Sequence, residues 1–135
     1  MTAAPAPAPA SGQTAKIRPR ARLAVLVGRT VAWASRVVRF GTGSVIGGRA
    51  SLLVDRNLLA ELTGSRDVAI VSATNGKTTT TKLLSAALSS GQPVVSNWLG
   101  ANMTPGIVAA LASANSTDTA VLEVDERWVD SVLRA

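Results

Sequence analysis

Residues 68–84 read VAIVSATNGKTTTTKLL, and this stretch carries the strongest pattern in the chain. Residues 68–71 are a short apolar run of the kind that forms a buried strand, and residues 78–88 have the spacing of a helix that Gly91 would end. A polar turn containing Gly-Lys-Thr joins the two. A strand, a tight turn and a helix start in this order are typical of a loop that binds phosphate.

The residue types of this loop suit phosphate chemistry. Gly76 lets the backbone turn and approach a phosphate, and the amides of residues 75–79 point at the anion, helped by the helix dipole. Lys77 places a positive charge on the β- and γ-phosphates, and the hydroxyl of Thr78 can hold Mg²⁺. The general phosphate-loop pattern has a further glycine where this chain has Val71, so the match to that pattern is incomplete.

Beyond the loop, apolar runs alternate with segments of helical spacing. The order β, α, β, α, β, α predicts an α/β fold with a parallel sheet, flanking helices and right-handed crossovers. Pro105 is expected at the first position of its helix, where a missing N–H costs nothing. After the loop helix, the expected elements are a strand at 94–95, a helix at 104–112, a strand at 120–124 and a helical stretch at 126–133.

The first half of the chain has a different character. Residues 1–19 are rich in Ala and Pro and form a basic tail that we expect to be disordered. Residues 20–40 have helical spacing, with arginines 22, 29 and 36 on one stripe and the larger apolar side chains on other faces. A short helix is expected at 55–62, with Asp55 as its N-cap, three leucines inward and Gly64 as its stop. The glycines expected to end the first helix in a flexible loop are Gly41, Gly43, Gly47 and Gly48.

The composition restricts the chemistry. The 135 residues include no His and no Cys, so imidazole ligands and bases, disulfides and thiolate metal sites are excluded. Any catalysis must use carboxylates, Lys, hydroxyls, amides and an oxygen-bound cation such as Mg²⁺. Charged residues, glycines or prolines interrupt every long apolar stretch, so we expect neither a secretory signal nor a transmembrane helix.

The charge is divided between the two halves. Residues 1–66 carry ten Lys or Arg and two acidic residues, a net charge of +8, whereas residues 67–135 carry four basic and six acidic residues, a net charge of −2. Two interpretations of the basic helix stay open: an ordinary solvated face, or an amphipathic surface that contacts anionic lipid or a partner protein. No nucleic acid is expected, because the helix lacks the interleaved aromatic side chains that stack on bases.

Residues 73–80, ATNGKTTT, resemble the shortened phosphate loop of Mur ligases and folylpolyglutamate synthases, which usually reads GTNGKTT; Ala73 stands in place of the first glycine. Two further stretches are similar to the MurT family, the Mur-ligase-like subunits of lipid II isoglutaminyl synthase. They are NWLGANM at 97–103, like the second loop, and VLEVDE at 121–126, like the third strand. The basic helix with residues 41–49 also resembles the start of MurT, so the resemblance covers about residues 20–135.

This resemblance implies an ATP-dependent carbon–nitrogen ligase. MurT proteins bind ATP with Mg²⁺ and phosphorylate the α-carboxylate of D-glutamate in the lipid II stem peptide. Ammonia from a GatD-type glutamine amidotransferase then converts the acyl-phosphate to D-isoglutamine, a step of peptidoglycan biosynthesis. Lys77 and Glu123 would be catalytic, and Thr78 and Glu123 would hold Mg²⁺ from the ends of two neighbouring strands. The ATP-binding residues would be Thr74, Asn75, Gly76, Lys77, Thr78 and Thr79.

Several polar residues near the loop have both a structural and a functional interpretation. The carboxylate of Glu123 lies inside an apolar run, where it either faces water or needs a partner, and a cation is the obvious one. Asp125 and Glu126 suit a helix cap and a first turn, or a metal or substrate role. Asn97 and Asn102 would contact the substrate or metal-bound water, or only shape a turn.

The resemblance also implies that more chain belongs to the complete protein, because MurT proteins are several times longer than 135 residues. Residues 67–135 would then be the first part of a Mur ligase central, ATP-binding domain whose sheet stops after about three strands. Residues 20–66 would be an N-terminal helical segment with a Gly-rich loop. Such a part alone is expected to be an incomplete enzyme. The implied location is the cytoplasm, including the inner face of the membrane, where lipid II lies.

Two other classes stay open. One is a fragment of another Mur-type ligase or of a folylpolyglutamate synthase, whose phosphate loop is alike, although residues 100–103 and 123–126 fit MurT better. The other is a non-enzymatic basic module that binds a membrane or a nucleic acid through residues 18–39.

Overall fold

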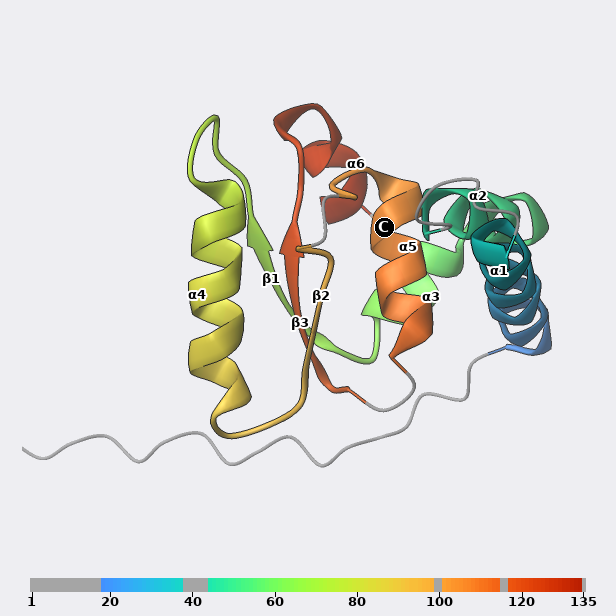
Figure 1. Ribbon diagram of the computed structural model, residues 1–135, viewed down its shortest axis with the longest axis horizontal. Helices are drawn as coiled ribbons and strands as arrows, with labels where there is room; N and C mark the ends of the chain where they lie inside the picture. Colours follow the sequence, from blue (N-terminus) through green and yellow to red (C-terminus); the bar gives the residue numbers. More distant parts are fainter. Residues whose placement is uncertain (1–17, 38–43, 99–100, 115–116, 135) are drawn as a thin grey trace, which may run out of the picture.

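Three parallel strands form the centre of the fold in a computed structural model of the chain. The strands are β1 (Asp67–Val71), β2 (Val94–Ser96) and β3 (Thr119–Glu123), and they lie in the order β1-β3-β2 (Figure 1). Both pairings with β3 are parallel, so the predicted α/β fold with a three-stranded parallel sheet is confirmed. The structure describes residues 18–37, 44–98, 101–114 and 117–134.

Helices cover both faces of this sheet. α4 (Lys77–Ser89) lies on one face and α5 (Thr104–Ser113) on the other, and each begins near its predicted position (Figure 1). The chain passes from β1 across to β2 and then returns to β3 in the middle, so right-handed connections place the two helices on opposite faces. Every residue of β3 is buried, as expected for the central strand of a parallel sheet.

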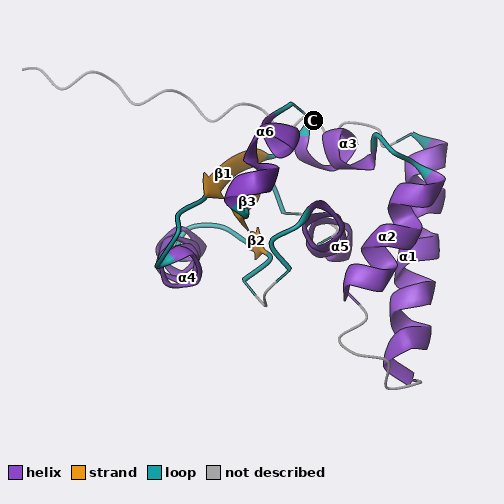
Figure 2. Ribbon diagram, turned by 90° about the horizontal axis from the view of Figure 1, so that it is seen from above, coloured by secondary structure: helices purple, strands orange, loops and turns teal. Residues whose placement is uncertain are grey.

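The helices before β1 extend the molecule on the α5 side. α1 (Pro19–Val37) and α2 (Ser44–Val54) form a pair at the end of the molecule opposite α4 (Figures 1 and 2). α3 (Leu58–Thr63) packs against α5. After β3, the 3-10 turn η1 (Glu126–Trp128) leads into α6 (Val129–Leu133), so the helical stretch predicted at the end of the chain is confirmed.

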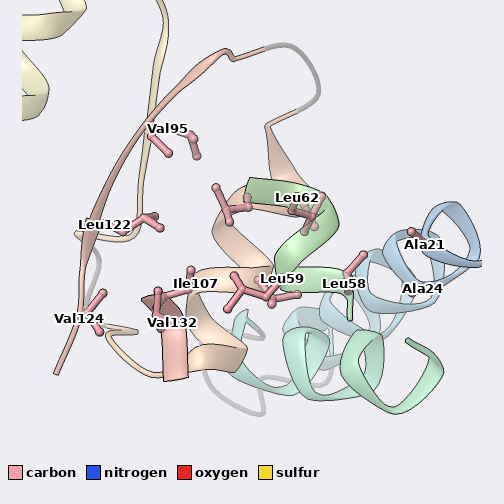
Figure 3. Packing of buried hydrophobic residues seen from close by; sticks show 14 residues of the cluster. Ala21, Ala24, Leu58, Leu59, Leu62, Val95, Ile107, Leu122, Val124 and Val132 are labelled. Carbon is pink, nitrogen blue, oxygen red and sulfur yellow. The ribbon is translucent and has the colours of Figure 1, made fainter. Parts of the chain in front are cut away.

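One apolar core joins the first half of the chain to the sheet. The three leucines of α3 that were expected to face inward are buried, and they lie between α1 and the layer formed by α5 and the sheet (Figure 3). Segments 20–66 and 67–135 therefore share a core. The buried members of this core are Ala21, Ala24, Leu58, Leu59, Leu62, Val95, Ile107, Val108, Leu111, Ala112, Ala120, Leu122, Val124 and Val132.

Glycines bring the backbones of three helices together, and this corrects one prediction. The expectation of a flexible loop through Gly47 and Gly48 is wrong, because both residues are buried inside α2. A Cβ atom on Gly48 would overlap the carbonyl oxygen of Pro105 in α5, and one on Gly47 would lie 2.6 Å from the carbonyl oxygen of Gly28 in α1. The close helix packing thus outweighs the low helix propensity of glycine.

The short helix α3 begins later than its predicted start at Asp55. The helix starts at Leu58, and the carboxylate of Asp55 accepts a hydrogen bond from the backbone N–H of Asn57 (3.0 Å) in the turn before it. Asp55 therefore closes the turn that leads from α2 into α3. Gly64 follows the last helical residue as predicted, but with right-handed backbone angles.

Arg66 lies just before β1 and joins the end of α3 to both ends of the connection between α5 and β3. Its guanidinium donates to the carbonyl oxygens of Leu62, Ala114 (2.9 Å) and Thr117 (2.9 Å). These carbonyls lie near the end of α3, after α5 and before β3, so one half-buried side chain holds three segments at the amino edge of the sheet. Among the described residues, Arg66 makes no hydrogen bond at the opposite, carboxyl edge of the sheet, where the predicted phosphate loop lies.

Some predictions concern residues outside the described ranges. The disordered tail at 1–19 falls almost entirely there, as do Phe40, Gly41 and Gly43, although α1 begins at Pro19. Among the described residues, no helix is both long enough and apolar enough to cross a bilayer.

Candidate phosphate-binding site

The predicted phosphate loop connects β1 to α4. β1 ends at Val71, residues 72–76 form a turn, and α4 begins at Lys77. Gly76 has φ 79° and ψ 0°, which lie in the left-handed region that residues other than glycine rarely adopt. A Cβ atom there would meet open space, so the requirement for glycine comes from its backbone angles.

The loop and the end of β3 line one pocket of about 330 Å³. β1 and β3 are neighbours, and Glu123 lies directly opposite Val71 in their register. The N–H of Val124 donates to the carbonyl oxygen of Val71 (3.0 Å), which fixes the end of β3 against the start of the loop. The structure therefore brings Glu123 to the loop, as expected for strand ends at one edge of a parallel sheet. The lining residues are Thr74, Asn75, Gly76, Lys77, Thr78, Thr79 and Glu123.

Glu123 is a buried carboxylate with an unpaired oxygen. Its exposed fraction is 4%, and Oε2 has no hydrogen-bond partner among the described residues. A buried carboxylate needs a compensating group, and a cation beside the loop would supply it. Within the described ranges, no three Asp or Glu residues come together to hold a metal ion. Mg²⁺ does not require such a cluster, because it is usually held by one or two carboxylates, waters and substrate phosphates. Glu123 and the Thr78 hydroxyl fit that pattern.

Lys77 lies folded over the loop. Its ammonium donates to the carbonyl oxygen of Ala73 and lies 3.5 Å from Oε2 of Glu126. The Lys77 side chain is 15% exposed, whereas that of Glu126 is 47% exposed. A phosphate in the pocket would compete with both oxygens for this ammonium.

The pKa of Glu126 is lowered, first by a hydrogen bond from its own backbone N–H and then by the positive charge of Lys77. Because the pKa is lowered, the carboxylate stays charged at neutral pH, and the ion pair is lost only as the pH falls through that lowered value. The sequence allows Glu126 to be a first-turn acid or a functional residue. It occupies the first turn of η1 and also pairs with the central lysine of the loop.

Asn97 is a positioning residue for Glu123. Its Oδ1 accepts from the backbone N–H of Glu123 (2.8 Å), and its Nδ2 donates to the carbonyl oxygens of Glu123 (2.8 Å) and Ala101 (2.9 Å). Asn97 is 4% exposed. The side-chain amide thus adds hydrogen bonds between β2 and β3. Asn97 does not line the loop pocket. These contacts favour the structural interpretation of Asn97 over a contact with the substrate.

Asn102 and Asp125 also have structural contacts. The carbonyl oxygen of Asn102 accepts from the N–H of Asp125 (3.1 Å), which joins the second loop to the end of β3. The Asp125 carboxylate accepts from the N–H of Arg127 (3.1 Å), so Asp125 is the N-cap of η1, one of the two roles considered for it. Asn102 does not line the loop pocket.

Asn97→Ala should destabilise the chain by about 2 kcal/mol, because it leaves the buried N–H and C=O of Glu123 without their partners. The measurement is the free energy of unfolding in urea, followed by circular dichroism. Asn102→Ala is the matched control, since Asn102 accepts the hydrogen bond from Asp125 through its backbone carbonyl, which the substitution keeps. Equal stabilities of the two variants would contradict the positioning role.

The second loop also contacts α4 through Trp98. The ammonium of Lys82 lies 4.9 Å from the centre of the Trp98 ring, a distance that allows a cation–π interaction. Trp98 is 42% exposed, so the ring is only partly covered. Lys82 therefore contacts Trp98 and not the loop, and Lys77 is the lysine that lines the pocket.

A second cavity of about 690 Å³ lies between α1, α2 and α5. Small side chains and glycines such as Gly28, Ala32 and Ala109 form much of its lining, with Ser96 and Asn97 at the end of β2. The smaller loop pocket is the better candidate for chemistry, because it combines a lysine, hydroxyls, helix-start amides and an unpaired carboxylate.

Comparison with known proteins finds several relatives, and they share the same name. No protein-family model matches the chain, and no solved structure matches it. The MurT subunit of lipid II isoglutaminyl synthase (glutamine-hydrolyzing) from Streptococcus pneumoniae is 40% identical over 94 residues, which is 65% of this chain and 21% of that protein. The same subunit from two Staphylococcus aureus strains is 35% identical over 96 residues, 68% of this chain and 22% of each protein.

The chain therefore spans about a fifth of the length of these curated relatives. The identity extends over some two thirds of the chain, more than a phosphate loop alone accounts for. By this similarity, the chain belongs to the MurT family.

Proposed function

We propose that the chain is the phosphate-binding part of a MurT subunit of lipid II isoglutaminyl synthase, and that it binds ATP with Mg²⁺ in the loop pocket. One observation carries the proposal. The pocket unites the helix-start loop, its lysine and a buried carboxylate whose Oε2 has no partner in the described chain. This is the combination that a magnesium-bound triphosphate requires.

Each residue of the pocket has a physical role in this proposal. The amides at the start of α4 and the helix dipole bind phosphate oxygens, and Gly76 supplies the left-handed turn that aims them. Lys77 moves from Ala73 and Glu126 to the β- and γ-phosphates. The Thr78 hydroxyl and the Glu123 carboxylate would hold Mg²⁺, which neutralises charge on the phosphates.

The reaction proposed for the complete subunit is the amidation of D-glutamate in the lipid II stem peptide. An oxygen of the α-carboxylate attacks the γ-phosphorus of ATP and ADP leaves. Ammonia then attacks the acyl carbon, phosphate leaves, and loss of a proton gives D-isoglutamine, the α-amide of D-glutamate. The relatives are named as subunits of a glutamine-hydrolyzing enzyme, which supports a GatD-type glutamine amidotransferase partner as the source of ammonia. Because ATP is available in the cytoplasm, we expect this activity there.

A titration of the chain with ATP tests the nucleotide site. In ¹⁵N-resolved NMR spectra, we expect ATP with Mg²⁺ to shift the amide signals of residues 75–79 and of Glu123. The dissociation constant should be on the order of 0.1 mM and about tenfold higher when EDTA removes the cation. AMP is the matched ligand control, because it lacks the β- and γ-phosphates.

Two outcomes would count against the site. One is that AMP and ATP bind equally. The other is that the shifted signals belong to the residues around the cavity between α1, α2 and α5. Activity with a partner subunit and lipid II belongs to a separate assay on the complete protein.

Glu126→Gln should tighten ATP binding about threefold, because the substitution removes a negative charge that competes with phosphate for Lys77. The effect is small because the Glu126 side chain is half exposed. Asp130→Asn is the matched control: it removes the same charge from α6, where Asp130 pairs with Arg134 (2.9 Å). The NMR titration measures both. Weaker binding by Glu126→Gln would mean that this carboxylate helps to hold the ligand.

A further inference from the structure

α1 packs on the rest of the molecule through its small residues. Ala21, Ala24 and Gly28 are buried, and a Cβ atom on Gly28 would overlap the Ser51 side chain of α2. Val25 also packs against the core, whereas four other apolar side chains stay largely exposed; one of these four, Trp33, also lines the cavity between α1, α2 and α5. Their exposed fractions are 54% for Leu23, 60% for Leu26, 65% for Trp33 and 63% for Val37.

These four side chains form one continuous stripe. They are spaced by three, seven and four residues, so they fall on one side of a helix with 3.6 residues per turn. Thr30 lies within the stripe, and its hydroxyl donates to the carbonyl oxygen of Val27 (2.9 Å) in the same helix. We call the stripe, with the three arginines described next, the outer face of α1.

Arginines follow one edge of the apolar stripe. Arg22 and Arg29 each precede an apolar member of the stripe by four residues, and Arg36 follows Trp33 by three. All three are exposed, and Arg29 and Arg36 also line the mouth of the cavity between α1, α2 and α5. Residues 1–54 contain eight Lys or Arg and no acidic residue, so the helix lies in a strongly positive part of the chain. The outer face thus combines apolar side chains, a tryptophan and an edge of positive charge.

We propose that the outer face of α1 binds an anionic membrane surface, with the helix lying parallel to it. Leu26 and Trp33 would enter the boundary between headgroups and acyl chains, and the arginines would meet lipid phosphates. The helix of 19 residues is about 28 Å long, enough for several turns to contact the surface at once. α1 also lies at the end of the molecule opposite α4 (Figures 1 and 2).

The charge pattern favours a membrane over other occupants. A second copy of the chain would bring two rows of arginines against each other, which is repulsive. A protein partner would have to match a narrow apolar stripe with acidic residues along one side only. An anionic lipid surface offers negative charge along the whole helix and an apolar layer below it. Tryptophan also prefers this interface.

Binding to vesicles tests the proposal on the whole chain without nucleotide, so its failure would leave the ATP site unaffected. Vesicles of phosphatidylcholine with about 30 mol% phosphatidylglycerol provide the anionic surface, and vesicles of phosphatidylcholine alone provide the comparison. We expect the chain to sediment with the anionic vesicles at low salt and to bind them at least tenfold more weakly in about 0.5 M salt. In the variant with Trp98→Phe and Trp128→Phe, brominated lipids should quench Trp33.

Two pairs of substitutions separate the apolar and the charged contributions. Leu26→Ser with Trp33→Ser should abolish sedimentation, whereas Leu83→Ser, at a similarly exposed position of α4 (68%), should not change it. Arg22→Gln with Arg36→Gln should weaken binding about 25-fold, since each basic side chain near the surface contributes about fivefold. Arg56→Gln with Arg134→Gln is the charge-matched control. Circular dichroism checks that each variant is folded.

Three outcomes would overturn the proposal. The first is that the chain stays in solution with anionic vesicles. The second is that control and test variants lose binding equally, which would mean a general attraction of a basic protein. The third is that Leu26→Ser with Trp33→Ser leaves vesicle binding unchanged but abolishes self-association or binding to a purified glutamine amidotransferase subunit. That last result would make the outer face of α1 a protein interface.

Discussion

Lys77→Ala is expected to weaken the binding of Mg²⁺ and ATP about a hundredfold. In the proposed complex, the Lys77 ammonium forms charge-assisted hydrogen bonds to the β- and γ-phosphates, and each such bond contributes about 1.5 to 3 kcal/mol. The variant also leaves the Ala73 carbonyl without its lysine contact. ATP affinity by calorimetry or NMR is the measurement. Stability should change by less than about 1 kcal/mol, because the pair with Glu126 is partly exposed.

Lys82→Ala is the matched control for this loss. Lys82 lies on the same helix and carries the same charge, but it contacts the Trp98 ring instead of the loop. We expect its ATP affinity to stay within about threefold of the unsubstituted chain. If the two lysine variants bound ATP equally well, phosphate binding at the loop would be contradicted and a diffuse attraction to the basic chain would remain.

Gly48→Val is expected to lower the free energy of unfolding by about 3 kcal/mol. A Cβ atom at this position overlaps the carbonyl oxygen of Pro105 and lies 2.6 Å from the carbonyl carbon. Both atoms belong to the backbone at the start of α5, so relief requires α2 to move away from α5 and expose the core behind it. The midpoint of thermal unfolding should fall by about 10 °C.

Gly91→Val is the control for the change of residue type. A Cβ atom on Gly91 has no heavy atom within 4 Å, and its backbone angles lie outside the left-handed region. This variant should differ from the unsubstituted chain by less than about 1 kcal/mol. A Gly48→Val variant as stable as Gly91→Val would mean that α2 and α5 are not packed through Gly48.

Much of the fold was predictable because its signals are local. The apolar run of β1, the turn at Gly76 and the helical spacing of α4 and α5 all lie within short segments, where backbone preferences act directly. Glu123 was also predictable as a partner of the loop, because parallel strands place their carboxyl ends at one edge of the sheet. The ligand roles of these residues stay predictions until nucleotide binding is measured.

Other features of the site depend on contacts between distant residues. Nothing near Asn97 in the sequence indicates that its amide holds the backbone of Glu123, since the pairing requires β2 and β3 to be neighbours. The ion pair between Lys77 and Glu126 likewise joins residues 49 positions apart. The sequence does place an acidic residue, Glu126, shortly after β3. An acid in the first turn of a helix gives the same sequence pattern, so the ion pair could not be predicted from it.

The local sequence thus specified the strands, the loop and the helix starts, because each follows from the conformational preferences of a few consecutive residues. Only the tertiary structure decided that Gly47 and Gly48 lie in a helix and that Ala21 and Ala24, instead of Leu26 and Trp33, face the core. Helical periodicity identifies two apolar faces on α1 but does not say which one is covered. The close approach of α1 and α2 admits only small side chains between them, and this non-local packing leaves the large ones outside.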